Sequence, residues 1–124
     1  VSGCTDATAC NYDALADTNL TSLVLNAASS GKVIKINSLT AANVDGTNAC
    51  NVDVSYHPST TTAVGSTVSS TGYHICKTVA VPADATLVVI SKDTALYMEE
   101  SSVLAVKASA ADDIDFVVSY EEIS

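Results

Sequence analysis

The spacing of apolar residues along the chain constrains the fold more than any other feature. They fall in short runs rich in Val, Ile, Thr and Tyr, separated by clusters of Ser, Gly, Asn and Asp. Such runs are typical of β-strands. Helical periodicity is nearly absent after the first 19 residues. Strand-like runs at intervals of about 10 to 15 residues predict an all-β chain, an antiparallel β-sandwich or jelly roll of about seven or eight strands.

The clearest strand is CNVDVSYH (residues 50–57), which has two sets of alternating side chains. The apolar set is Cys50, Val52, Val54 and Tyr56, and the polar set is Asn51, Asp53, Ser55 and His57. Strict alternation predicts a half-buried strand. The run KVIKINSLTAANV (32–44) has mixed faces, which indicates burial on both sides or a bend. We expect PSTTTAVGSTVSSTG (58–72) to form a polar loop or hairpin tip that adds nothing to the core, and loops of this length are often functional.

The organisation predicted for the 124 residues is a single domain preceded by a short segment. The first part, residues 1–19, is expected to be an irregular, cysteine-containing N-terminal arm, and residues 20–124 are expected to form the β-sandwich. No basic region followed by an apolar stretch marks a signal peptide, and no apolar run is long enough to span a membrane.

The charge of the chain excludes some partners. Its formal net charge is -9, with 14 acidic residues against five basic ones, all lysines. Such a chain repels phosphates and lacks the arginines that read base edges, so nucleic acid is not an expected partner. We expect no membrane partner either.

Residues with catalytic or metal-binding chemistry are few. Ser55 and His57 share a strand face, but no nucleophile motif surrounds them, and no Gly-rich phosphate loop is present. Neither histidine has the convergent ligands of a metal site. The acidic and amide side chains of the arm lack the spacing of an EF-hand calcium loop; they are Asp6, Asn11, Asp13 and Asp17. We therefore predict no enzyme, no metal and no cofactor.

Two tyrosine–histidine pairs flank the long loop: Tyr56 and His57 before it, Tyr73 and His74 after it. We expect these four residues to lie on polar strand faces or at the loop mouth, where they would form a contact surface.

The four cysteines allow three disulfide connectivities. Cys50 and Cys76 lie in strands that flank the long loop, so either a buried disulfide or two free core thiols fits, with the disulfide slightly favoured. Cys4 and Cys10 are close in sequence, where a disulfide would staple the arm. The predicted pairing is Cys4 with Cys10 and Cys50 with Cys76.

The N-terminal stretch GCTDATACNYDALAD resembles a short motif of secreted and surface proteins of marine bacteria and their phages. In that motif a Gly and a further Cys follow, whereas here Asp17 is followed by TNLTS, which favours the pairing of Cys4 with Cys10 or leaves both as thiols. The rest of the chain is similar to small β-sandwich virion proteins of tailed phages of marine cyanobacteria. That likeness is carried by SSGKVIKINSLTAANV, KTVAVPADATLVVI and LYMEESSVLAVKASAADDIDFVVSYEEI.

The resemblance implies a non-enzymatic structural component of a phage virion, outside the cell. Within that class it favours a capsid decoration or cement protein that binds the particle through its arm, sheet edges and loops. The expected partners are capsid or other virion proteins and further copies of the chain. The alternatives are a secreted adhesin or filament subunit, and a carbohydrate-binding module that uses Tyr56 and Tyr73; the lack of tryptophan weighs against the module.

Overall fold

The structure is a computed structural model that describes residues 19–110 and 113–124, together with the backbone of residues 10–15. The described residues form nine strands and a single 3-10 turn. These elements are β1 (Cys10–Leu15), β2 (Thr21–Asn26), β3 (Val33–Asn43), β4 (Cys50–Pro58), β5 (Tyr73–Val81), β6 (Thr86–Ile90), η1 (Lys92–Thr94), β7 (Leu96–Met98), β8 (Ser102–Ala108) and β9 (Ile114–Ile123). Among these residues no helix is long and apolar enough to cross a membrane.

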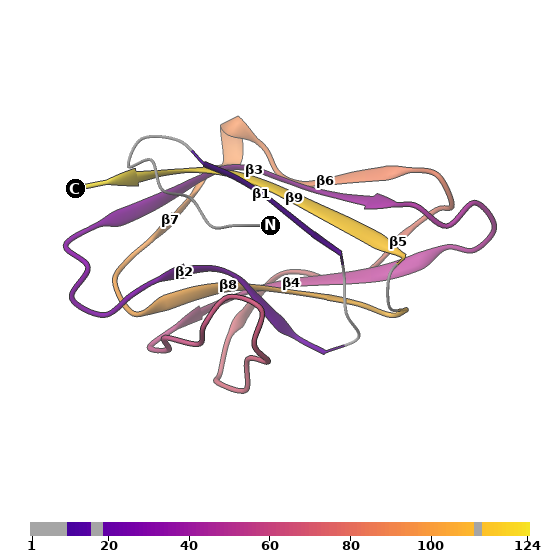
Figure 1. Ribbon diagram of the computed structural model, residues 1–124. Coiled ribbons are helices and arrows are strands. Elements are labelled where there is room, and N and C mark those ends of the chain that lie inside the picture. The colour runs from indigo at the N-terminus through magenta and orange to yellow at the C-terminus, as the bar shows by residue number, and fades with distance from the viewer. Residues whose placement is uncertain (1–9, 16–18, 111–112) are drawn as a thin grey trace.

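The strands form two antiparallel sheets that face each other as the layers of a sandwich (Figure 1). One sheet has the order β1-β9-β3-β6, with β7 also paired to β3, and the other has the order β2-β8-β4-β5. The pairs are nested: β4 with β5, β3 with β6 and β7, β2 with β8, and β1 with β9. A long antiparallel ribbon folded over in this way is a jelly roll. The predicted fold class is confirmed.

The core lies between the two sheets and consists of inward side chains from both. The largest fully buried ones are Phe116, Ile36, Leu39, Met98 and Leu104. Ile36 and Leu39 both face the core although they are three positions apart, because the pairing of β3 with β9 shifts register between Ile36 and Ser38. A β-bulge of this kind bends a strand. The mixed faces of residues 32–44 therefore reflect a bend.

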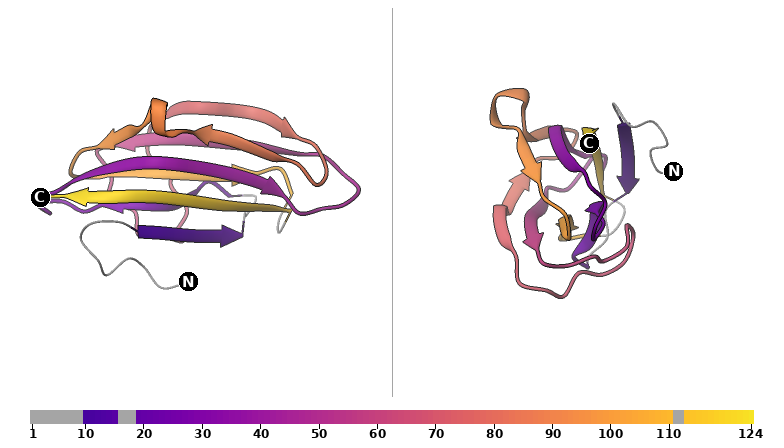
Figure 2. Two further views of the ribbon diagram at one scale, coloured as in Figure 1. Left: turned by 90° about the horizontal axis from the view of Figure 1, so that it is seen from above. Right: turned by 90° about the vertical axis from the view of Figure 1, so that its left-hand side faces the viewer.

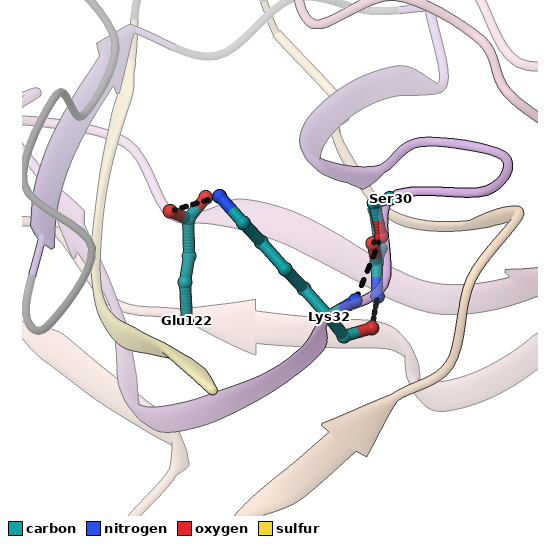
Figure 3. A network of polar contacts seen from close by, with 4 residues as sticks. Ser30, Lys32 and Glu122 are labelled. Atoms are coloured by element: carbon teal, nitrogen blue, oxygen red, sulfur yellow. Dashed lines mark hydrogen bonds and ion pairs between the residues drawn. The ribbon is translucent and has the colours of Figure 1, made fainter. Parts of the chain in front are cut away.

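A buried asparagine fixes the connection between β2 and β3 at one end of the sandwich. The Asn26 amide donates to the carbonyl oxygens of Lys32 and Met98, at 2.9 and 3.0 Å, and its oxygen accepts a hydrogen bond from Ser30 at 2.6 Å. Figure 3 shows the neighbouring contacts, in which the Lys32 ammonium lies 3.4 Å from a Glu122 carboxylate oxygen. The β2–β3 connection is thereby tied to both β7 and β9.

The segment predicted as an irregular arm contributes a strand to the sandwich. Residues 10–15 form β1, which pairs with β9 from Cys10 opposite Tyr120 to Leu15 opposite Asp115. Figure 2 shows β1 beside β9 at the edge of its sheet. The expected boundary after residue 19 does not separate these residues from the sandwich, because their backbone continues the sheet. Cys4 and the Cys10 side chain lie outside the described residues, and so does their predicted disulfide.

Candidate functional site

The candidate site lies on the outer face of the four-stranded sheet, the face turned away from the other sheet. Cys50, Val52 and Val54 of β4 are buried in the core, as the alternation predicts. The polar set points outward in two pairs, Asn51 with Asp53 and Ser55 with His57. The neighbouring strand β8 places Ala105 opposite Ser55, Val103 opposite His57 and Lys107 opposite Asp53.

Residues 59–72, here called the cover loop, fold over one half of this outer face. Val68 of the loop is only 4% exposed and packs on Val103 and Ala105 in a second, smaller apolar cluster, which Leu20 and Leu25 border. Apolar burial of this kind anchors a loop to a sheet. The expectation that this segment adds nothing to the core is therefore wrong.

The cover loop is also hydrogen-bonded to the start of β2. Ser22 donates its amide to the Ser66 carbonyl and accepts from the Gly65 amide, both at 2.9 Å, and the Val68 amide donates to the Leu20 carbonyl at 2.8 Å. These bonds occupy backbone groups that an edge strand otherwise exposes. The loop thus covers both a face and part of an edge of the sheet.

His57 links the cover loop to the sheet beneath it. The side chain is buried, 2% exposed, and its Nε2 lies 2.7 Å from the Ser55 hydroxyl. Its Nδ1 lies 3.1 Å from the Ser70 carbonyl oxygen. A carbonyl can only accept, so Nδ1 carries the proton and Nε2 accepts from Ser55. Gly72 lies against the imidazole so closely that a Cβ there would overlap the ring.

Burial lowers the pKa of His57, and the nearby imidazole of His74 lowers it further. Hydrogen bonding to the Ser70 carbonyl acts in the opposite direction and is outweighed. Desolvation disfavours the charged form of a histidine. His57 is therefore neutral at neutral pH, as its hydrogen bonds require.

The Ser55 hydroxyl and His57 Nε2 are as close as a nucleophile and its general base, but the pair lacks the solvent access and the carboxylate partner of a catalytic site. Ser55 is 1% exposed beneath the cover loop, so its hydroxyl is closed to a substrate. Nδ1 is bonded to a backbone carbonyl, where a catalytic triad would place a carboxylate. The pair serves as a latch that holds the loop on the sheet.

The four predicted contact residues do not form one surface. His57 is buried, and Tyr56 is half-buried and packs against the main core. Tyr73 is 66% exposed, and His74 is exposed opposite Ser55. Only the residues after the loop are therefore open to a partner.

The predicted disulfide between Cys50 and Cys76 is not formed, because both are free thiols. The strands do pair, but their register places Val81 opposite Cys50 and Val54 opposite Cys76. The two cysteines are thus offset along the ladder. Burial raises the pKa of the Cys76 thiol, which keeps it protonated at neutral pH.

Metal-ligand geometry is absent from the part of the chain that the structure describes, where no three His, Cys, Asp or Glu side chains converge. The calcium-ligand set considered in the sequence, which includes Asp6 and Asp17, lies outside the described side chains.

The other half of the outer face is open and forms a hollow of about 310 Å³, here called the polar depression. It is lined by Asn51, Asp53, Thr78, Lys107, Ala108 and Ser109. The sequence placed Asp53 on a polar strand face, but nothing in it distinguished this half from the half beneath the loop. Thr78 lines the hollow because the pairing of β5 with β4 is irregular at this point, and nothing in the sequence predicted that irregularity.

Comparisons with models of known families, with curated proteins and with solved structures found no match. The fold and the geometry of this face define a jelly-roll β-sandwich, one of whose outer faces is half closed by a latched loop.

Proposed function

We propose that the chain is a non-enzymatic structural component of a phage virion, a capsid decoration or cement protein that binds the particle surface. Jelly rolls recur in viral capsid proteins, where a rigid sandwich presents loops and edges to its neighbours. The likeness of three sequence stretches to small virion proteins supports the same class. Fold alone does not assign function, so the proposal also needs a contact surface.

The observation that carries the proposal is the exposed edge of the four-stranded sheet at the start of β5. Tyr73 and Ile75 are 66% and 38% exposed, with His74 between them also exposed. No described strand pairs with the free side of β5. An exposed tyrosine beside an aliphatic side chain is typical of the residues that dominate binding energy in protein interfaces.

The other edge of the same sheet is partly occupied. The cover loop is hydrogen-bonded to the start of β2, and in the second sheet β1 pairs along β9. We therefore propose β5 and the adjoining end of the cover loop as the contact with the particle.

The test is co-sedimentation of the purified protein with particles that lack it. We expect wild-type protein to sediment with the particles at a fixed number of copies, and the Tyr73→Ser, Ile75→Ser double variant to bind about tenfold more weakly or worse. The matched control is Tyr97→Ser, because Tyr97 is 58% exposed on β7 of the opposite sheet. Its binding should be unchanged.

Two outcomes contradict the proposal. Wild-type protein that never sediments with particles would refute a virion role. Equal losses in the Tyr97 variant would refute the β5 contact. Polymers of the isolated chain would instead favour a filament subunit that accepts a neighbour's strand at β5.

A further inference from the structure

The polar depression has a mixed chemical character that restricts what can occupy it. Asp53 of β4 and Lys107 of β8 are directly opposite in the strand register. The ammonium of Lys107 nevertheless forms no ion pair within 4.0 Å with any described carboxylate. Asn51 and Ser109 extend the same face, where the backbone N–H of Asn51 donates to the Ser109 hydroxyl at 2.9 Å. A carboxylate, an ammonium, an amide and hydroxyls thus surround one hollow.

The wall formed by β5 is held in a strained conformation. Thr78 has a φ of 52°, in the left-handed region that a β-branched residue rarely adopts. Its amide donates to the Asp53 carboxylate at 2.5 Å. The register passes from Val52 opposite Val79 to Val54 opposite Cys76, so two residues of β5 oppose Asp53 alone. Bulges are over-represented beside binding sites, and strained residues cluster there.

The opposite charges of Asp53 and Lys107 disfavour the binding of charged ligands in the depression. An anion that approaches Lys107 meets the Asp53 carboxylate, and a cation that approaches Asp53 meets the ammonium. A neutral ligand with several hydroxyls satisfies both, because each hydroxyl can donate to the carboxylate and accept from the ammonium or an amide. The volume of about 310 Å³ lies at the lower end of the range for small-molecule sites.

We propose that the polar depression on β4, β5 and β8 binds a neutral sugar. Asp53 accepts from adjacent sugar hydroxyls, and Lys107 and Asn51 donate to them. The proposal does not rest on the virion role. The lining holds no aromatic side chain on which a ring could stack, so dissociation constants on the order of 1 mM are expected for single sugars.

The experiment is a titration of ¹⁵N-labelled wild-type protein with free hexoses and with their methyl glycosides, followed by amide chemical shifts. We expect saturable shifts at Asn51, Asp53, Thr78 and Lys107 and none in β3 or β9. Glycosides that bind at least as tightly as the free hexoses would assign the site to the end of a glycan, and much weaker binding of the glycosides would assign it to free sugars. Sodium acetate and methylammonium chloride serve as charged probes, which should give no saturable shift at these amides.

Two variants test the assigned roles. Lys107→Met and Asp53→Asn should each weaken sugar binding about tenfold, and Asp53→Asn keeps an oxygen that can accept from the Thr78 amide. The control is Lys35→Met, a lysine on the opposite sheet. Absence of any saturable shift up to about 50 mM sugar, far above the expected affinity, would overturn the proposal. So would acetate or methylammonium binding as tightly as the sugars, or equal weakening in the Lys35 variant.

Discussion

Two halves of one sheet face differ completely in their surroundings, although the same strands build both. Ser55 and His57 of β4 are buried beside Val103 and Ala105 of β8 under the cover loop. Two residues along the same strand, Asp53 lies open opposite Lys107. The alternating pattern of β4 predicts the same outward orientation for all of these polar side chains. The outward residues of the neighbouring strand differ, being apolar in one half and polar in the other, and the apolar half is the one that the loop covers.

The difference shows that a polar side chain contributes to stability when it is buried with all of its hydrogen-bonding groups paired. His57 is buried at little cost because both ring nitrogens have partners, Ser55 and the Ser70 carbonyl. Asp53 accepts one hydrogen bond from the Thr78 amide and remains partly exposed. We therefore expect changes in the covered half to alter stability, and changes in the open half to alter binding.

The largest effect is expected for His57→Ala. Removal of the ring leaves the buried Ser55 hydroxyl and the Ser70 carbonyl without partners and opens a cavity, which should lower the free energy of unfolding by about 3 kcal/mol. Urea denaturation measures this loss. The control is His74→Ala, an exposed histidine, whose change should stay within about 0.5 kcal/mol. Equal losses in the two variants would contradict the latch.

A smaller loss is expected for Gly72→Ala. The added methyl group would overlap the His57 ring, which its two hydrogen bonds hold in place, so the loop must shift at a cost of about 2 kcal/mol. Thermal unfolding followed by circular dichroism tests the difference against Gly46→Ala. There the new Cβ would meet the Asp84 carboxylate at an ordinary 3.7 Å, so the unfolding temperature should hardly change.

The latch should also weaken on acidification. The pKa of His57 lies below its ordinary value of 6.5 in the folded protein, so the unfolded chain binds the proton first as the pH falls. The free energy of unfolding should be level above about pH 7 and should decrease below pH 6.5, toward the lowered pKa. Asp45 acts in a separate, more acidic range, because the Thr47 amide lowers its pKa below 3.8.

Urea denaturation of the wild type and of His57→Gln at a series of pH values measures this dependence. The glutamine variant should lose the decrease between pH 6.5 and the lowered pKa, while both proteins keep the carboxylate-linked decrease at lower pH. A decrease of equal size in the two proteins would assign the effect to another group.

The smallest effect on stability is expected in the open half. Asp53→Asn and Lys107→Met should each change the free energy of unfolding by no more than about 0.5 kcal/mol, since neither side chain is buried. Urea denaturation measures both. A loss as large as that of His57→Ala would show that the polar depression is a structural element.

Much of the fold follows from the sequence because strand alternation is a local property. The run at 50–57 corresponds closely to β4, and the jelly roll agrees with the predicted class. The nested pairing depends on contacts between distant segments, so no single run reveals it. The cysteine prediction failed for a related reason: the residue opposite Cys50 is set by the register of β5 against β4 across the cover loop, and neither strand's own sequence gives that register.

The candidate site was less predictable than the fold. The cover loop contains mostly Ser, Thr and Gly, and a single well-placed valine, Val68, joins it to the sheet. One signal was present in β8, where Val103 to Val106 are apolar on both faces. A strand buried on both sides needs a cover on its outer face, and that cover is the loop.

Amide hydrogen exchange of the wild-type protein at neutral pH tests the latched cover loop most directly. The Ser22, Gly65 and Val68 amides donate hydrogen bonds between the loop and β2, so they should exchange far more slowly than those of an unstructured chain. In His57→Ala these three amides should lose protection while those between β3 and β9 keep theirs. Exchange of the Gly65 and Val68 amides in the wild type at the rates of a free peptide would contradict the account.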